Sequence, residues 1–123
     1  MKAVLLVSHG SHSPETKKEV GQLVRQLMSR NVADIVADAY LEIETPSISD
    51  GIETCVRQGV QEIVILLNFL NSGRHVDQDI PAIIKRAQKK YPDVKFSITK
   101  PLGHHPRIVE LFINLLSKSG TRD

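Results

Sequence analysis

The chain has 123 residues, a formal net charge of +2 and only 4% aromatic side chains. This length suits one domain, and the scattered charges with few rings to stack on bases argue against a nucleic-acid-binding protein. Cys55 is the single cysteine, which excludes an internal disulfide and a thiolate metal cage. No run reaches the roughly 18 apolar residues of a membrane span. We therefore expect a cytoplasmic protein without membrane attachment.

The first half of the chain predicts two strands, each followed by a helix. Lys2–Ser8 is an apolar strand, and a helix with an apolar stripe begins at Pro14. Ile35–Tyr40 is a weaker strand of mixed polarity. A second helix is predicted to start at Thr45-Pro46 and to end at Gly59.

The second half repeats this alternation. Glu62–Leu67 is a wholly apolar strand, Ile80–Tyr91 is a helix that Pro92 ends, and Asp93–Ile98 alternates like an edge strand. Pro106 opens a last helix, and we expect the tail at 117–123 to fray. The apolar stripe of this last helix consists of Ile108, Leu111, Phe112, Leu115 and Leu116, and we expect it to face the sheet.

Strands that alternate with helices predict an α/β fold with parallel strands and right-handed crossovers. Continuous apolar runs belong at the centre of such a sheet, whereas mixed runs belong at its edges. We therefore expect residues 1–123 to form one flavodoxin-like domain with helices on both faces. With the strands numbered along the chain, the predicted sheet order is 2-1-3-4.

Two histidines follow the two most apolar strands. His9 comes directly after Lys2–Ser8, and His75 follows Glu62–Leu67 across a short connection. In the predicted order these strands are neighbours and the chain switches direction between them, so both side chains should lie at the carboxyl edge where open α/β sheets bind ligands. Imidazole is the commonest metal ligand and exchanges protons near neutrality. The pair therefore indicates metal or proton chemistry.

Acidic residues could complete such a site. Glu42 and Glu44 follow the second strand, so one of them can face the same crevice as a ligand or a base, although an isolated loop glutamate is more often solvated. Asp77 and Asp79 have an ordinary explanation as caps of the following helix.

Basic residues near this edge suit an acidic substrate. Arg74 precedes His75, and an arginine grips a carboxylate in fork geometry. His104 and His105 follow the last strand and either extend the site or simply begin the last helix. Each of these residues could equally be a solvated surface group.

Several common enzyme motifs are absent from the sequence. It contains no Gly-x-Gly-x-x-Gly, no Walker-type loop and no Gly-x-Ser-x-Gly nucleophile elbow. Phosphatases that form a phosphohistidine carry arginine before the histidine, and Ser8 occupies that position here. The hypothesis that the protein is a phosphoryl-transfer enzyme is therefore the weaker one.

Four segments together resemble the small CbiX family of sirohydrochlorin chelatases, over residues 2 to about 116. They are Val7-Ser8-His9-Gly10-Ser11, Tyr40-Leu41-Glu42 with Pro46, Gly73-Arg74-His75-Val76 with Asp79-Ile80-Pro81, and Leu102-Gly103 with Pro106. The resemblance implies insertion of a divalent ion into sirohydrochlorin on the routes to cobalamin or sirohaem. Cobalt is the first expectation, then nickel or iron, as a substrate rather than a bound cofactor. The resemblance also implies a homodimer.

The resemblance assigns roles to particular residues. His9 and His75 match the metal-binding histidines of the family, and Glu42 matches the nearby acid, so these three are the expected catalytic residues. Sirohydrochlorin carries eight carboxylates, and from their places near the sheet edge, rather than from the resemblance, we expect four residues to contact it: Ser11, His12, Arg74 and His104. Proton acceptance and metal binding compete for the same imidazole lone pair, so acid should suppress the reaction. The alternative from another class is a non-catalytic carrier of the metal or the tetrapyrrole.

Overall fold

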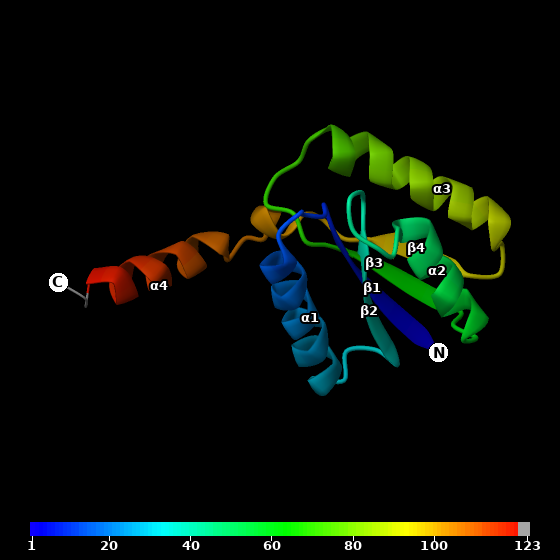
Figure 1. Cartoon of the computed structure of the whole chain (residues 1–123), viewed down its shortest axis with the longest axis horizontal. Helices are drawn as coiled ribbons and strands as arrows, with labels where there is room; N and C mark the ends of the chain where they lie inside the picture. Colours follow the sequence, from blue (N-terminus) through cyan, green and yellow to red (C-terminus); the bar gives the residue numbers. More distant parts are fainter. Residues whose placement is uncertain (121–123) are drawn as a thin grey trace.

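The sheet has four parallel strands in the order β2-β1-β3-β4, which confirms the predicted fold class and strand order (Figure 1). The computed structural model describes residues 1–120. Its strands are β1 (Lys2–Ser8), β2 (Ile35–Tyr40), β3 (Glu62–Leu67) and β4 (Lys95–Ile98). The last strand begins at Lys95 rather than at the predicted Asp93, because Pro92 and Asp93 form a turn before it.

Four α-helices connect and follow the strands. They are α1 (Pro14–Ser29), α2 (Ile48–Arg57), α3 (Ile80–Lys90) and α4 (Ile108–Gly120), with a π-helical turn η1 (His75–Asp79) before α3 and a 3₁₀ turn η2 (Leu102–His104) before α4. The predicted start of α2 at Thr45-Pro46 is wrong by two to three residues. Ser47 caps this helix, since its Oγ accepts a hydrogen bond from the Asp50 N–H at 3.1 Å, and the cis Thr45–Pro46 bond lies in the loop before it.

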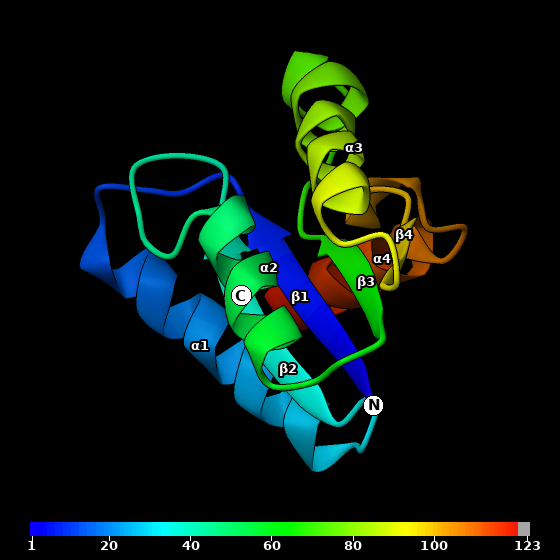
Figure 2. The same ribbon diagram turned by 90° about the vertical axis from the view of Figure 1, so that its right-hand side faces the viewer.

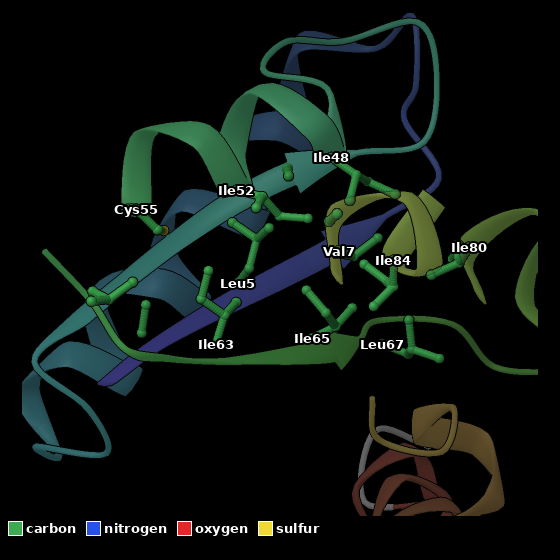
Figure 3. Close-up of a cluster of buried hydrophobic side chains, with 14 of the residues drawn as sticks. Leu5, Val7, Ile48, Ile52, Cys55, Ile63, Ile65, Leu67, Ile80 and Ile84 are labelled. Carbon is green, nitrogen blue, oxygen red and sulfur yellow. The ribbon is translucent and has the colours of Figure 1, made fainter. Parts of the chain in front are cut away.

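The main core lies between the sheet and the pair α2 and α3 (Figure 3). Leu5 and Val7 of β1 point to this face, where Ile52 of α2 and Ile80 of α3 pack against them. Ile63 is also completely buried there, and full burial of such a side chain is worth about 1.5–3 kcal/mol. The two central strands are therefore anchored firmly, which fixes the carboxyl edge from which the site residues emerge.

The opposite face of the sheet has only partial cover. Leu6 of β1 points to it and packs with Val20 of α1 and with Tyr40. The Tyr40 hydroxyl donates to Asp38 at 2.7 Å, and burial together with this carboxylate raises the pKa of Tyr40 well above its usual range. Figure 2 places α2 and α3 on the near side of the sheet, opposite to α1 and α4.

The expectation that α4 packs its stripe on the sheet is wrong. Residues 109–119 are all exposed, and α4 extends away from the domain on the side of α1 (Figure 1). The helix also continues to Gly120, so Ser117–Gly120 are helical rather than frayed as predicted, whereas residues 121–123 lie outside the described part. None of the helices within residues 1–120 has the length and apolar character that crossing a membrane requires.

Candidate functional site

The two histidines meet at the carboxyl edge of the sheet, as the strand order predicts. His9 follows β1 directly, and His75 is the first residue of η1 after β3. Their ring centroids are 5.2 Å apart with the ring planes tilted by 60°. Two residues separated by 66 positions thus present their imidazoles to one another because β1 and β3 are hydrogen-bonded neighbours.

Glu42 joins this pair as a third possible metal ligand. Its Oε1 lies 2.8 Å from His9 Nε2 and 4.0 Å from His75 Nε2. One ligand atom from each residue lies within 4.8 Å of the others, and all three side chains are about half exposed to solvent, at 45–50%. Two imidazoles and one carboxylate leave coordination positions open, as in catalytic rather than structural metal sites. The cluster can therefore hold a metal ion whose open coordination positions face solvent, where water or another molecule can bind it.

The backbone around Glu42 has an unusual conformation that separates the two glutamates. Ile43 has a φ of 72°, and the Glu44 N–H donates to the Glu42 carbonyl oxygen at 2.8 Å, which makes a three-residue γ-turn. A β-branched residue in the left-handed region is strained, and such strain is concentrated at functional sites. The turn leaves Glu42 with His9, while Glu44 accepts a hydrogen bond from the Ser11 N–H at 2.9 Å.

Asp79 orients His75, a role that the capping interpretation missed. His75 Nδ1 lies 2.8 Å from Asp79 Oδ2, across one turn of η1. When Nδ1 carries the proton donated to this carboxylate, Nε2 presents its lone pair toward Glu42 and His9, as in carboxylate–histidine–metal triads. Asp79 makes no side-chain cap to α3. The spacing of four residues on one helical turn was the signal for this contact in the sequence.

Replacing Asp79 with asparagine should weaken cobalt binding by about 10-fold, because an amide orients the imidazole less firmly than a carboxylate does. Asp77→Asn is the matched control, since Asp77 is exposed in the same turn and lies two residues away. Isothermal titration with Co²⁺ measures both affinities, and circular dichroism checks that the helices persist. Equal cobalt affinities in the two variants would contradict the role of Asp79.

Ser11 and His12 lie apart from the metal-ligand cluster, in a hollow of about 680 Å³ beside the start of α1. Its lining also includes Lys17, Lys18 and Arg25, cations that the sequence analysis did not single out. These side chains suit carboxylates, because ammonium and guanidinium groups pair with them. A role of Ser11 and His12 in substrate binding stays a prediction.

Arg74 and His104 are also outside the cluster of three ligands. Arg74 is exposed just before η1, and His104 Nε2 lies 3.1 Å from the Ser72 hydroxyl oxygen. His105 Nδ1 accepts a hydrogen bond from the Arg107 N–H at 3.0 Å, which agrees with a role at the start of α4. Of the residues predicted for the site, the structure thus gathers His9, Glu42 and His75, and substrate contacts of Arg74 and His104 remain predictions.

Comparison with known proteins agrees with the resemblance found in the sequence. The family model named CbiX matches residues 3–119. A sirohydrochlorin cobaltochelatase of Priestia megaterium is 36% identical over 98% of this chain and 39% of its own length. A chloroplastic sirohydrochlorin ferrochelatase of Arabidopsis thaliana is 32% identical over 88% of this chain and 48% of its own. The chain thus spans less than half the length of these two relatives.

A solved structure reproduces the fold over almost the whole chain. The sirohydrochlorin chelatase SirB of Bacillus subtilis subspecies spizizenii, in complex with cobalt, superposes with a TM-score of 0.86 at 29% identity. The match covers 95% of this chain and 50% of the SirB chain. The fold described here is therefore that of about one half of a cobalt-binding chelatase.

Proposed function

The chain belongs to the CbiX family, and from this premise we propose that it inserts a divalent metal ion into sirohydrochlorin. The observation that carries the proposal is the open cluster of His9, Glu42 and His75, whose ligand atoms lie within 4.8 Å of one another. Relatives named as cobaltochelatase and ferrochelatase, each at least 32% identical, support the same reaction class, that of a metal chelatase.

The chemistry of metal insertion suits these residues. Metalation of the ring exchanges two pyrrole protons for one divalent ion, so the protein must release the ion and accept protons in the same place. His9 and His75 can hold the ion through Nε2, and each freed lone pair can then take a proton. Glu42, 2.8 Å from His9 Nε2, is placed to serve as a third ligand or as a base. Half-exposed ligands favour this exchange, because water and substrate can reach the ion.

We extend the proposal to the metal and the assembly. Cobalt is the first metal expected, which the cobaltochelatase of Priestia megaterium and the cobalt-bound SirB support. Nickel and ferrous iron are proposed as further substrates, since nitrogen and oxygen ligands bind all three ions and metal supply, rather than raw affinity, decides which ion is used. We also propose a homodimer in the cytoplasm. Sirohydrochlorin would meet the protein through its carboxylates, for which the cations around Ser11 and His12 and at Arg74 are suited.

Anaerobic absorption spectroscopy tests the proposed reaction. Purified protein is mixed with sirohydrochlorin and with Co²⁺, Ni²⁺ or Fe²⁺ separately, and conversion to the metallated spectrum is followed against the uncatalysed rate. We expect protein-dependent conversion that saturates with sirohydrochlorin and is fastest with cobalt. Bound but unconverted tetrapyrrole with every metal would overturn the proposal in favour of a carrier.

A further inference from the structure

Two loops carry the metal ligands His9 and Glu42, and they lie side by side beyond the ends of β1 and β2 (Figure 2). Two backbone bonds continue the pairing of these strands into the loops. The Leu41 N–H donates to the Ser8 carbonyl oxygen at 2.9 Å, and the Glu42 N–H donates to the His9 carbonyl oxygen at 3.0 Å. The γ-turn centred on Ile43 follows directly, so this pairing does not reach the second half of the loop.

Glu44 ties the second half of the loop back to the chain after His9. Its Oε2 accepts a hydrogen bond from the Ser11 N–H at 2.9 Å, and both residues are partly buried. A hydrogen bond to an ionised carboxylate is about twice as strong as one between neutral groups. Ser11 lies two residues after His9, and Glu44 lies two residues after Glu42. The bond therefore closes a small ring, whose other side is the hydrogen bond between Glu42 and His9.

Lys17 of α1 holds the same loop at a second point. Its Nζ donates to the Thr45 carbonyl oxygen at 2.7 Å and lies 5.5 Å from the centroid of the Tyr40 ring. Tyr40 is buried at the end of β2 and offers the ammonium a fixed aromatic face, which is a favourable cation–π contact. Glu44 and Lys17 both line the hollow beside α1, so replacing either of them leaves no cavity in the core.

The conformation of Ile43 indicates that the loop needs these contacts. Its φ of 72° is one that β-branched residues avoid, and such a conformation persists only where the surrounding structure enforces it. The backbone bonds to β1 fix the chain before Ile43, whereas Glu44 and Lys17 fix it afterwards. Without the later contacts Ile43 can relax to an ordinary φ, and this rotation turns the peptide that joins it to Glu42.

We propose that Glu44 and Lys17 are positioning residues, which hold Glu42 in place as the third metal ligand. The ligand cluster found among the described residues includes neither side chain. This inference rests on the metal site of the proposed function, but its test reads cobalt binding rather than metal insertion. A chain that binds cobalt as expected below without inserting it leaves the inference standing. An active enzyme whose cobalt binding is insensitive to both residues overturns the inference alone.

The opposite charges of the two residues provide the first test. Glu44→Ala removes a negative charge near the ion and Lys17→Met removes a positive one, so electrostatics alone would weaken cobalt binding in the first variant and strengthen it in the second. Loss of positioning should weaken it in both, by about 10-fold for Glu44→Ala and about 3-fold for Lys17→Met. Isothermal titration with Co²⁺ measures the affinities, and circular dichroism checks the fold. Unchanged or stronger cobalt binding by Lys17→Met would overturn the proposal.

Glu44→Gln separates the hydrogen bond of Glu44 from its charge. The amide oxygen can still accept from the Ser11 N–H, so this variant should keep its cobalt affinity within about 3-fold of the unmodified chain. Glu15→Ala is the control for the loss of one negative charge and should leave cobalt binding unchanged, because Glu15 is exposed on α1 and pairs with Lys18 at 3.5 Å. Equal losses in Glu44→Ala and Glu44→Gln would assign the effect to charge and overturn the proposal.

The visible spectrum of bound Co²⁺ identifies the ligand that is lost. The intensity of its d–d bands depends on the number and geometry of the ligands, so Glu44→Ala at saturating cobalt should give the spectrum of Glu42→Ala rather than that of the unmodified chain. The double variant should bind cobalt no more weakly than Glu42→Ala, because Glu44 then has no ligand to position. An unaltered spectrum in Glu44→Ala, or additive losses of affinity in the double variant, would overturn the proposal.

Discussion

Replacing either His9 or His75 with alanine should lower the rate of sirohydrochlorin metalation by about 100-fold or more while leaving the fold intact. Each imidazole supplies one of the three ligand atoms that the described chain brings within 4.8 Å, and the two remaining groups cannot hold a divalent ion firmly at an exposed position. Both side chains are about half exposed, so truncating them leaves no cavity in the core.

The measurement compares initial metalation rates with Co²⁺ and, separately, cobalt affinity by titration. Both quantities should fall together if the histidines deliver the metal. Gln78→Ala is the control, because Gln78 is exposed in the same turn as His75 and outside the ligand cluster. Near-normal rates in both histidine variants would show that the ion reaches the ring by another route, and loss of helical signal would assign the effect to folding instead.

The sequence predicted the sheet well because burial on both faces leaves a clear pattern. β1 and β3 are almost wholly apolar, and only central strands of a parallel sheet need such a composition. That inference placed the two strands side by side and therefore brought His9 and His75 together. The juxtaposition of the histidines followed from hydrophobicity alone, without any statement about the site.

The same kind of pattern gave the wrong result for α4. Apolar residues at helical spacing show that a face will be buried, but they do not say against what. Phe112 and Leu115 have the periodicity of a helix that packs on its own sheet, yet they lie in solvent in the described chain. In sequence, a last helix that packs on its own sheet has the same apolar spacing as one that extends into solvent.

Local side-chain geometry was also beyond the sequence. Asp79 stands where a helix cap is common, and its spacing of four residues from His75 allows either a cap or a contact with the imidazole. The structure shows that it bonds to His75 in the π-helical turn. The left-handed conformation of Ile43 has no signal at all, since β-branched residues avoid this region and a pattern-based prediction would place a glycine or an asparagine there. This turn decides which glutamate reaches the histidines.

Gly10 is the position where a single methyl group should do the most structural damage to the site. Its φ is 106°, and a Cβ built on it would lie 1.9 Å from the Glu42 carbonyl oxygen, so the backbone itself must move. The Glu42 N–H also donates to the His9 carbonyl oxygen at 3.0 Å beside this contact. Gly10→Ala should therefore separate Glu42 from His9 as well as strain the chain.

Gly59→Ala isolates the cost of the backbone conformation. Gly59 has a φ of 91°, but a Cβ there meets nothing within 4 Å. We expect this control to lose about 1 kcal/mol of unfolding free energy, or about 4 °C in melting temperature, with cobalt affinity unchanged. Gly10→Ala should lose about 3 kcal/mol or more and bind cobalt at least 10-fold more weakly.

Thermal unfolding by circular dichroism and cobalt titration on both alanine variants separate the two effects. Strain alone would lower both melting temperatures equally and spare cobalt binding in both, because the φ values of the two glycines are alike. A clash with Glu42 would lower the cobalt affinity of the Gly10 variant only. Equal behaviour of the two variants would therefore mean that the close approach of Gly10 to the Glu42 carbonyl does not hold the metal ligands in place.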